Sequence, residues 1–203
     1  MIRLDPGRTL FDQGDAADFV YNVTAGTVRL SMTLSDGRRQ ITGFMLPGDF
    51  IGLSSRAVHS YSAEAVSPSQ LCRFNAPALR QMAERVPGLE HELFARVRDE
   101  LDAAHDQMLL LGRKSPREKI ATFLLDLAGR RQRWGERPDR VHLDMTRGDI
   151  GDYLGLTLET VSRTLNRMKR DGVIALPSAA EVVFLKTEVI EGLAQSQVPA
   201  RPG

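Results

Sequence analysis

The sequence predicts an α+β protein with three parts in order: a small β-barrel or jelly roll, one long helix, and a winged helix-turn-helix. Three observations predict this fold class. The first 75 residues contain short runs rich in Val, Ile, Leu, Phe and Thr, separated by glycine turns. After residue 87, apolar residues repeat at helical spacing over about six turns. Near residue 155, the pattern predicts two short capped helices around a turn that contains glycine.

Charge is divided unequally along the 203-residue chain, although the formal net charge is only +1. Residues 1–112 carry 11 basic and 14 acidic side chains, a net charge of −3, whereas residues 113–203 carry 16 and 12, a net charge of +4. The near-neutral total therefore averages an acidic half and a basic half. No run of 18 apolar residues is present, and cysteine occurs once. We therefore expect no membrane span, no membrane partner and a reducing cytoplasmic location.

Six strands are predicted in the first 75 residues. They are Thr9–Phe11, Phe19–Thr24, Thr27–Leu34, Arg39–Met45, Ser62–Val66 and Gln70–Phe74. A glycine stands in four of the turns between them, at Gly14, Gly26, Gly37 and Gly48. Glycine suits these positions because it adopts positive φ without strain. Many short antiparallel strands at this spacing predict a jelly roll or β-roll, and we expect this domain to occupy residues 1–86.

A long helix is predicted over residues 87–112. Its apolar residues recur at steps of three and four, at Leu93, Val97, Leu101, Ala104, Met108 and Leu111. Charged residues fill the other faces of this helix. A stripe this narrow on a helix this long resembles a coiled-coil seam, which predicts a homodimer formed through these six residues. The alternative is that the stripe packs against the β-roll of its own chain.

A further domain is predicted over residues 113–203. Ser115, Pro116 and Glu118 have the spacing of a capping box with proline at the first helical position, so we expect a new helix to begin there. The apolar residues expected to form its buried face are Ile120, Phe123, Leu124 and Leu127. We interpret residues 129–140, which are rich in Arg, Gly and Pro, as a loop.

Residues 146–171 contain the most specific pattern in the chain. A capping box opens a short helix at Thr146, Gly155 supplies a compact turn, and Thr157 caps a second helix. Gly172 follows the second helix as a C-terminal cap. The apolar stripe of the second helix is Leu158, Val161, Leu165 and Met168. These features define a helix-turn-helix.

A β-hairpin is predicted directly after the helix-turn-helix. Its strands are Val173–Leu176 and Val182–Leu185, and residues 141–143 are expected to add a third strand. A hairpin in this position is the wing of a winged helix-turn-helix.

The outward face of the second helix indicates a function. Its members, on the side opposite the apolar stripe, are Glu159, Ser162, Arg163, Asn166, Arg167 and Arg170. In this motif the N-terminal end of the helix enters the major groove of DNA, where Glu159 can accept from a cytosine amino group and Arg163 can donate two hydrogen bonds to guanine. Arg167 and Arg170 suit phosphate oxygens. We also expect DNA contacts from residues near the two helix starts, Thr146, Arg147, Thr157 and Thr160. The alternative is a solvated surface helix.

With these residues in view, the chain resembles the Crp/Fnr family of bacterial transcription regulators, in its Fnr/FixK-like branch. The run from Met145 to Arg163 carries the resemblance, together with the segments Ile41–Phe44 and Gly48–Gly52. It implies a β-roll sensor domain of the cyclic-nucleotide-binding type, a dimerisation helix and a winged helix-turn-helix.

In the Fnr/FixK-like branch, the E-x-x-S-R triplet reads half-sites of the TTGAT type, and the matching residues here are Glu159, Ser162 and Arg163. The resemblance therefore implies a homodimer on a palindromic operator in double-stranded DNA. It also implies an activator that contacts RNA polymerase, with a role in oxygen- or redox-linked gene control.

The resemblance also bears on an effector site in the β-roll. Relatives that bind cyclic nucleotides hold the ribose with a Glu after the turn glycine and the phosphate with an Arg-Ser pair, whereas this chain has Leu53 and His59-Ser60. An apolar side chain cannot accept hydrogen bonds from ribose, and a mostly neutral histidine is a poor substitute for arginine, so we do not expect cyclic AMP. The alternative is an effector-gated regulator that binds another small ligand at Leu53, His59 and Ser60, or haem through His105.

Cysteine and histidine usage argues against metal cofactors and against catalysis. Fnr proteins hold a [4Fe-4S] cluster with three N-terminal cysteines and a central one, and only the central one has a match here, at Cys72. We therefore expect no iron–sulfur cluster. Cys72 is interpreted as a buried core residue, with a redox-sensing thiol as the alternative. The four histidines lack metal-ligand spacing, and no nucleophile–base pair or phosphate loop is evident, so we expect no metal site and no enzyme activity.

Overall fold

The computed structural model describes residues 1–53 and 56–195. The chain forms two compact units, Met1–Gln107 and Met108–Gly203, and the boundary between them falls inside the long helix. No helix in the described ranges is both long enough and apolar enough to cross a membrane.

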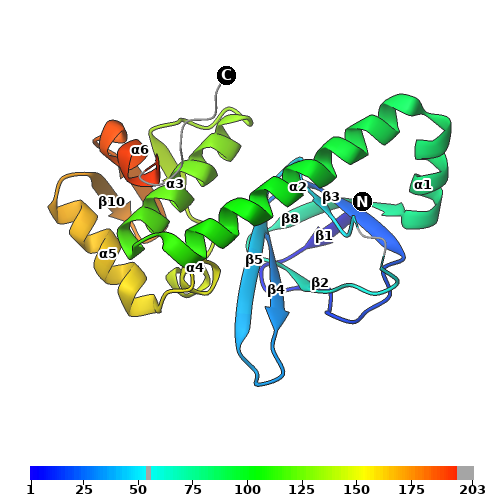
Figure 1. Ribbon diagram of the computed structural model, residues 1–203, viewed down its shortest axis with the longest axis horizontal. Helices are drawn as coiled ribbons and strands as arrows, with labels where there is room; N and C mark the ends of the chain where they lie inside the picture. Colours follow the sequence, from blue (N-terminus) through cyan, green and yellow to red (C-terminus); the bar gives the residue numbers. More distant parts are fainter. Residues whose placement is uncertain (54–55, 196–203) are drawn as a thin grey trace. The chain divides into compact units, whose positions relative to one another are not determined.

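The first unit contains a β-roll built from two four-stranded antiparallel sheets (Figure 1). One sheet has the order β1-β8-β3-β6. Its strands are β1 (Ile2–Leu4), β8 (Ser69–Asn75), β3 (Phe19–Ala25) and β6 (Phe50–Ile51). The other sheet has the order β2-β7-β4-β5. Its strands are β2 (Thr9–Phe11), β7 (Ser62–Ala65), β4 (Val28–Thr33) and β5 (Arg39–Met45).

The six predicted strands are confirmed to within one residue at each end. The sequence analysis missed β1 and β6, which have three and two residues and are too short for an alternating pattern to stand out. The predicted turn glycines all have positive φ. At Gly26, where φ is 82°, an added Cβ would also lie 2.3 Å from the carbonyl oxygen of Pro68. The roll therefore closes tightly at that turn.

Apolar side chains from both sheets fill the inside of the β-roll. The buried core residues are Phe11, Tyr21, Val23, Val28, Leu30, Ile51, Ala63 and Leu71. Successive residues of a strand point to opposite faces, so Leu71 takes the inner face of β8 and Cys72 takes the outer face. The interpretation of Cys72 as a core residue is therefore wrong, because its side chain is only partly buried.

Two helices follow the β-roll along the chain. Helix α1 (Ala76–Arg85) begins at Asn75, whose side chain accepts a hydrogen bond from the backbone N–H of Ala78. Helix α2 (Pro87–Arg113) agrees with the predicted long helix to within one residue.

The stripe predicted on α2 lies open to solvent. Val97, Leu101 and Met108 are 46%, 56% and 62% exposed, Ala104 and Leu111 are also exposed, and Leu93 is partly buried. Phe94, which the sequence analysis did not include, extends the same face and is 60% exposed. The alternative in which this stripe packs against the β-roll of its own chain is therefore wrong.

The second unit continues with four helices and a small sheet among its described residues. The helices are α3 (Pro116–Gln132), α4 (Arg147–Leu154), α5 (Leu158–Arg170) and α6 (Thr187–Gln195). The sheet has the order β10-β11-β9, with β10 (Ile174–Ser178), β11 (Glu181–Phe184) and β9 (Arg140–His142). The hairpin and its third strand are thus confirmed. Helix α6 was not predicted.

Helix α3 is the centre of this unit and packs against α5 and α6. Its predicted capping box is present, since the Ser115 hydroxyl accepts from the Glu118 N–H and the Glu118 carboxylate accepts from the Ser115 N–H. Its four predicted core residues are buried, and so are Ile190 of α6 and the inner face of α5, the two helices against which α3 packs.

The predicted loop over residues 129–140 is wrong at its start, because α3 continues to Gln132. Arg131 accounts for the extra turn. Its guanidinium group lies 2.5 Å from the Asp144 carboxylate and 2.9 Å from that of Glu136, and its side chain is 13% exposed. These two ion pairs hold the last turn of α3 against the segment that leads into α4.

Candidate nucleic-acid interface

The helix-turn-helix is formed by α4, a short turn and α5. The Thr146 hydroxyl accepts from the backbone N–H of Asp149 at 3.1 Å, and the Asp149 carboxylate accepts from the N–H of Thr146 at 3.1 Å. Gly155 ends α4 in the left-handed region with φ of 62°, and the Thr157 hydroxyl caps α5 by accepting from the N–H of Thr160. Each predicted cap of this motif is confirmed.

Two residues that the sequence analysis missed determine how α4 meets its surroundings. A Cβ added at Gly151 would lie 2.6 Å from the Leu156 carbonyl oxygen, so the turn can pack against α4 only because this residue is glycine. The Lys119 ammonium of α3 donates to the Leu154 carbonyl at the end of α4, at 3.0 Å, and the side chain is 7% exposed. Burial lowers the pKa of Lys119. A lysine among the apolar residues of α3 was the only sequence signal for this contact.

Helix α5 has one buried face and one open face. Val161, Leu165 and Met168 are buried against the rest of the unit, as predicted. Leu158 is 52% exposed, so its assignment to the buried stripe is wrong. It is the first residue of α5, and its Cδ1 lies near Gly148 of α4, while about half of the residue faces solvent. Periodicity alone does not show where the packing partner of a helix ends.

The open face of α5 contains the residues predicted to contact DNA. Glu159, Arg163, Asn166, Arg167 and Arg170 are exposed, and Thr160 and Ser162 are partly buried. At the helix starts, Thr146 and Thr157 are exposed and Arg147 is partly buried. Hydrogen bonds from its own backbone N–H and from the Thr157 hydroxyl lower the pKa of the fully exposed Glu159. Glu159 is therefore an ionised hydrogen-bond acceptor at neutral pH.

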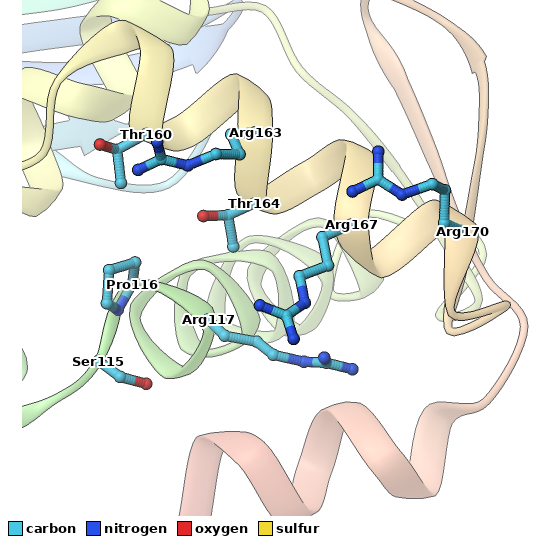
Figure 2. Close-up of a pocket in the computed structure, with 8 residues that line it drawn as sticks. All are labelled: Ser115, Pro116, Arg117, Thr160, Arg163, Thr164, Arg167 and Arg170. Atoms are coloured by element: carbon cyan, nitrogen blue, oxygen red, sulfur yellow. The ribbon is translucent and has the colours of Figure 1, made fainter.

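A positively charged groove runs between α5 and the start of α3 (Figure 2). It has a volume of about 520 Å³ and is lined by Ser115, Pro116, Arg117, Thr160, Arg163, Thr164, Arg167 and Arg170. Arg117 forms an ion pair with Asp171 at 2.6 Å. Within residues 1–53 and 56–195, the guanidinium groups of Arg163, Arg167 and Arg170 have no hydrogen-bond or ion-pair partner. Three uncompensated cations beside a helix start make this surface suited to an anion.

Comparisons with known proteins agree with this geometry. Residues 1–86 match the cyclic nucleotide-binding domain family, and residues 118–190 match the Crp-like helix-turn-helix domain family. The transcriptional activator protein FnrL of Cereibacter sphaeroides is 42% identical over 181 residues, which cover 87% of this chain and 73% of FnrL. This chain belongs to the Crp/Fnr family of DNA-binding transcription regulators.

Two FixK proteins place this Crp/Fnr regulator near the FixK-like members of the family. The nitrogen fixation regulation protein FixK of Bradyrhizobium diazoefficiens is 42% identical over 175 residues, which cover 86% of this chain and 74% of FixK. The structure of FixK2 from Bradyrhizobium japonicum superposes with a TM-score of 0.89, at 36% identity, over 98% of both chains. The resemblance and the α+β fold class stated from the sequence are both confirmed.

The N-terminal domain of the regulator keeps His59 inside the β-roll. The ring is 4% exposed and stacks on Phe11, with 3.6 Å between ring centroids and 10° between planes. Burial lowers the pKa of His59, against smaller opposing effects of the Asp15 and Asp18 carboxylates. The imidazole is therefore a neutral aromatic core group, which does not fit the phosphate of a cyclic nucleotide.

The other residues of the candidate effector pocket stay a prediction. Leu53 and Ser60 are partly buried. The loop that begins at Leu53 includes residues 54 and 55, which lie outside the described residues. His105 is exposed on α2.

The metal groups known in the family have few ligands here. Across the part of the chain that the structure describes, no three His, Cys, Asp or Glu side chains are grouped as a metal site. A [4Fe-4S] cluster needs four ligands, and Cys72 is the single cysteine among these 203 residues.

Proposed function

We propose that this regulator binds a palindromic operator with TTGAT-type half-sites as a homodimer and activates transcription through contact with RNA polymerase. The open face of α5 carries the proposal. Glu159 and Arg163 are exposed one helical turn apart in the N-terminal half of that helix, with Ser162 beside them. An ionised carboxylate there suits the cytosine amino group, and a free guanidinium suits the O6 and N7 atoms of guanine.

The remaining residues of the interface position the protein without reading sequence. Arg167 and Arg170 lie farther along α5 in the positively charged groove, where phosphate oxygens are the complementary groups. Thr146 and Thr157 lie at the starts of α4 and α5, where the helix dipole favours a negatively charged phosphate. Asn166, Thr160 and Arg147 complete the proposed contact surface.

The homodimer is supported by the exposed apolar stripe of α2. Leu101 and Met108 expose more than half of their side chains in a single chain, at the spacing of a coiled-coil seam. A second copy of the same helix is the partner that matches such a seam. A two-fold dimer presents two copies of α5 to two half-sites about one DNA turn apart, as a palindrome requires.

We further propose that the protein is active without a small-molecule effector, haem or iron–sulfur cluster. The His59–Phe11 stack supports this, because two of the protein's own rings pack together inside the β-roll. Relatives named for nitrogen fixation and for fumarate and nitrate reduction support a role in oxygen- or redox-linked gene control.

The proposal is tested by measuring the affinity and stoichiometry of the full chain on three duplexes. These are an inverted repeat of TTGAT half-sites, the same duplex with one half-site scrambled, and a fully scrambled duplex. We expect two subunits on the inverted repeat and an affinity at least about 10³-fold above that for the scrambled duplex. Equal affinity for all three duplexes would contradict the proposed readout, and a single bound subunit would contradict the dimer.

A further inference from the structure

One ion pair at the edge of the positively charged groove has no role in the fold or function described so far. The Arg117 guanidinium, in the first turn of α3, donates to the Asp171 carboxylate at 2.6 Å. Asp171 is the residue that ends α5, and the two positions are 54 residues apart in sequence. Both side chains are partly exposed, at 31% and 39%. A pair this exposed to solvent adds little stability, so stability alone does not account for it.

Arg117 lies in the groove that is proposed to bind DNA phosphates, so its pairing with Asp171 affects that groove. Arg117 lines the same groove as Arg163, Arg167 and Arg170, and Figure 2 shows Arg167 extending from α5 toward the start of α3. Arg117 is the member of this set whose charge is neutralised by a carboxylate.

A carboxylate and a phosphate present the same kind of acceptor to arginine. Both offer two oxygen atoms in a geometry that matches the guanidinium fork. Asp171 therefore occupies Arg117 in the way that a DNA phosphate would. A phosphate that enters the groove meets three open arginines and one that is already paired.

We propose that Asp171 holds Arg117 in the DNA-free protein and thereby limits the sequence-independent part of DNA affinity. The inference rests on the proposed function and adds a pair, outside the reading triplet, that limits affinity for DNA of any sequence. When Asp171 is neutralised, Arg117 is released to a phosphate, and each subunit gains one phosphate contact. Such a contact strengthens binding to every sequence, so the protein is retained more strongly on non-cognate DNA.

The test compares four full-length proteins: wild type, Asp171→Asn, Arg117→Ala and the double variant. Their affinities for a random-sequence duplex and for a TTGAT-type inverted repeat are measured between 50 and 200 mM salt. For Asp171→Asn we expect tighter binding to both duplexes and a slope of log K against log salt that is steeper by about 0.9 per bound subunit. The advantage over wild type is then about 3.5-fold larger per subunit at 50 mM than at 200 mM.

The Arg117→Ala variants distinguish a new contact between Arg117 and a DNA phosphate from the general effect of removing the negative charge of Asp171. Loss of a negative charge tightens binding with or without Arg117, but the slope changes only if Arg117 reaches a phosphate. We therefore expect no change of slope between Arg117→Ala and the double variant. Glu188→Gln is the matched control, because it removes an exposed carboxylate that has no arginine partner in the described part of the chain. Its slope should equal that of wild type.

Thermal unfolding establishes that each variant is folded, and asparagine is compatible with the position at the end of α5. An unchanged slope in Asp171→Asn, or an equal steepening in the Arg117→Ala background, overturns the inference while leaving the proposed function intact. A wild-type protein that binds neither duplex overturns the proposed function and the inference with it.

Discussion

Replacing Gly151 with alanine tests how closely the turn of the helix-turn-helix packs against α4. The new Cβ would lie 2.6 Å from the carbonyl oxygen of Leu156, a backbone atom that cannot rotate away. The turn must therefore move, and α5 moves with it. Gly129 of α3 is the matched control, because it is also a helical glycine but has no atom within 4 Å of an added Cβ.

The expected magnitudes follow from these two environments. Overpacking typically costs about 1–3 kcal/mol. Replacing a helical glycine with alanine gains about 0.5–1 kcal/mol. Gly151→Ala should therefore lower the free energy of unfolding by up to about 2.5 kcal/mol, which corresponds to a Tm up to about 15 °C lower for a domain of this size. Gly129→Ala should raise stability by up to about 1 kcal/mol, because only the gain in helix propensity applies.

Fluorescence of Trp134, the single tryptophan of the sequence, reports thermal unfolding of the second unit. DNA affinity measured at 20 °C, where both variants are folded, reports the position of α5. We expect at least a tenfold loss for Gly151→Ala and no loss for Gly129→Ala. If Gly151→Ala is as stable as wild type and binds DNA equally well, the close approach of the turn to α4 does not constrain the motif.

Other expected outcomes follow from single side chains. Arg163→Ala should cost about 1–3 kcal/mol of binding free energy on a cognate duplex and relax the preference at one base. Arg170→Ala should weaken binding to all sequences and lower the slope of log K against log salt by about 0.9 per subunit. Equal losses of affinity on cognate and scrambled DNA for Arg163→Ala would refute the readout. Leu101→Glu should convert the dimer to monomers, as measured by sedimentation velocity. Asp102→Asn, on another face of α2, should leave the dimer intact. A dimeric Leu101→Glu protein would contradict a dimer interface formed by this stripe. Because burial lowers the pKa of His59, the unfolded chain binds a proton more readily than the folded one, so stability should fall as pH drops through the ordinary histidine pKa of 6.5. Urea denaturation measures the free energy of unfolding at pH 7.5 and at pH 5.5. The loss between the two should be smaller in His59→Phe than in wild type. An equal loss in both proteins would contradict a buried neutral imidazole.

Short-range chemistry explains why much of the helix-turn-helix could be predicted. Thr146 and Thr157 each cap a helix through an N–H three residues away, and Gly155 needs a positive φ in its own turn. Signals of this kind lie within four residues, so one sequence is enough to recognise them. The reading roles of Glu159 and Arg163 rest on the family resemblance together with their place on the outer face of α5.

The features that could not be predicted depend on contacts between distant segments. The Lys119 ammonium bonds to Leu154, which is 35 residues away, and Arg117 pairs with Asp171 across 54 residues. Leu158 fits the apolar period of α5, but it is 52% exposed. His59 shows no periodic signal for its stack on Phe11. Tertiary packing decides each of these cases, and local pattern does not encode it.

Selection of bound sequences from a random DNA pool tests the central claim most directly. The purified full-length protein is mixed with random duplexes, and bound DNA is recovered, amplified and sequenced over several rounds. We expect enrichment of a two-fold symmetric sequence with TTGAT-type half-sites about one DNA turn apart, because two copies of α5 read the two halves. Enrichment of an asymmetric sequence, or of none, would contradict the claim that this regulator reads a palindrome through Glu159, Ser162 and Arg163.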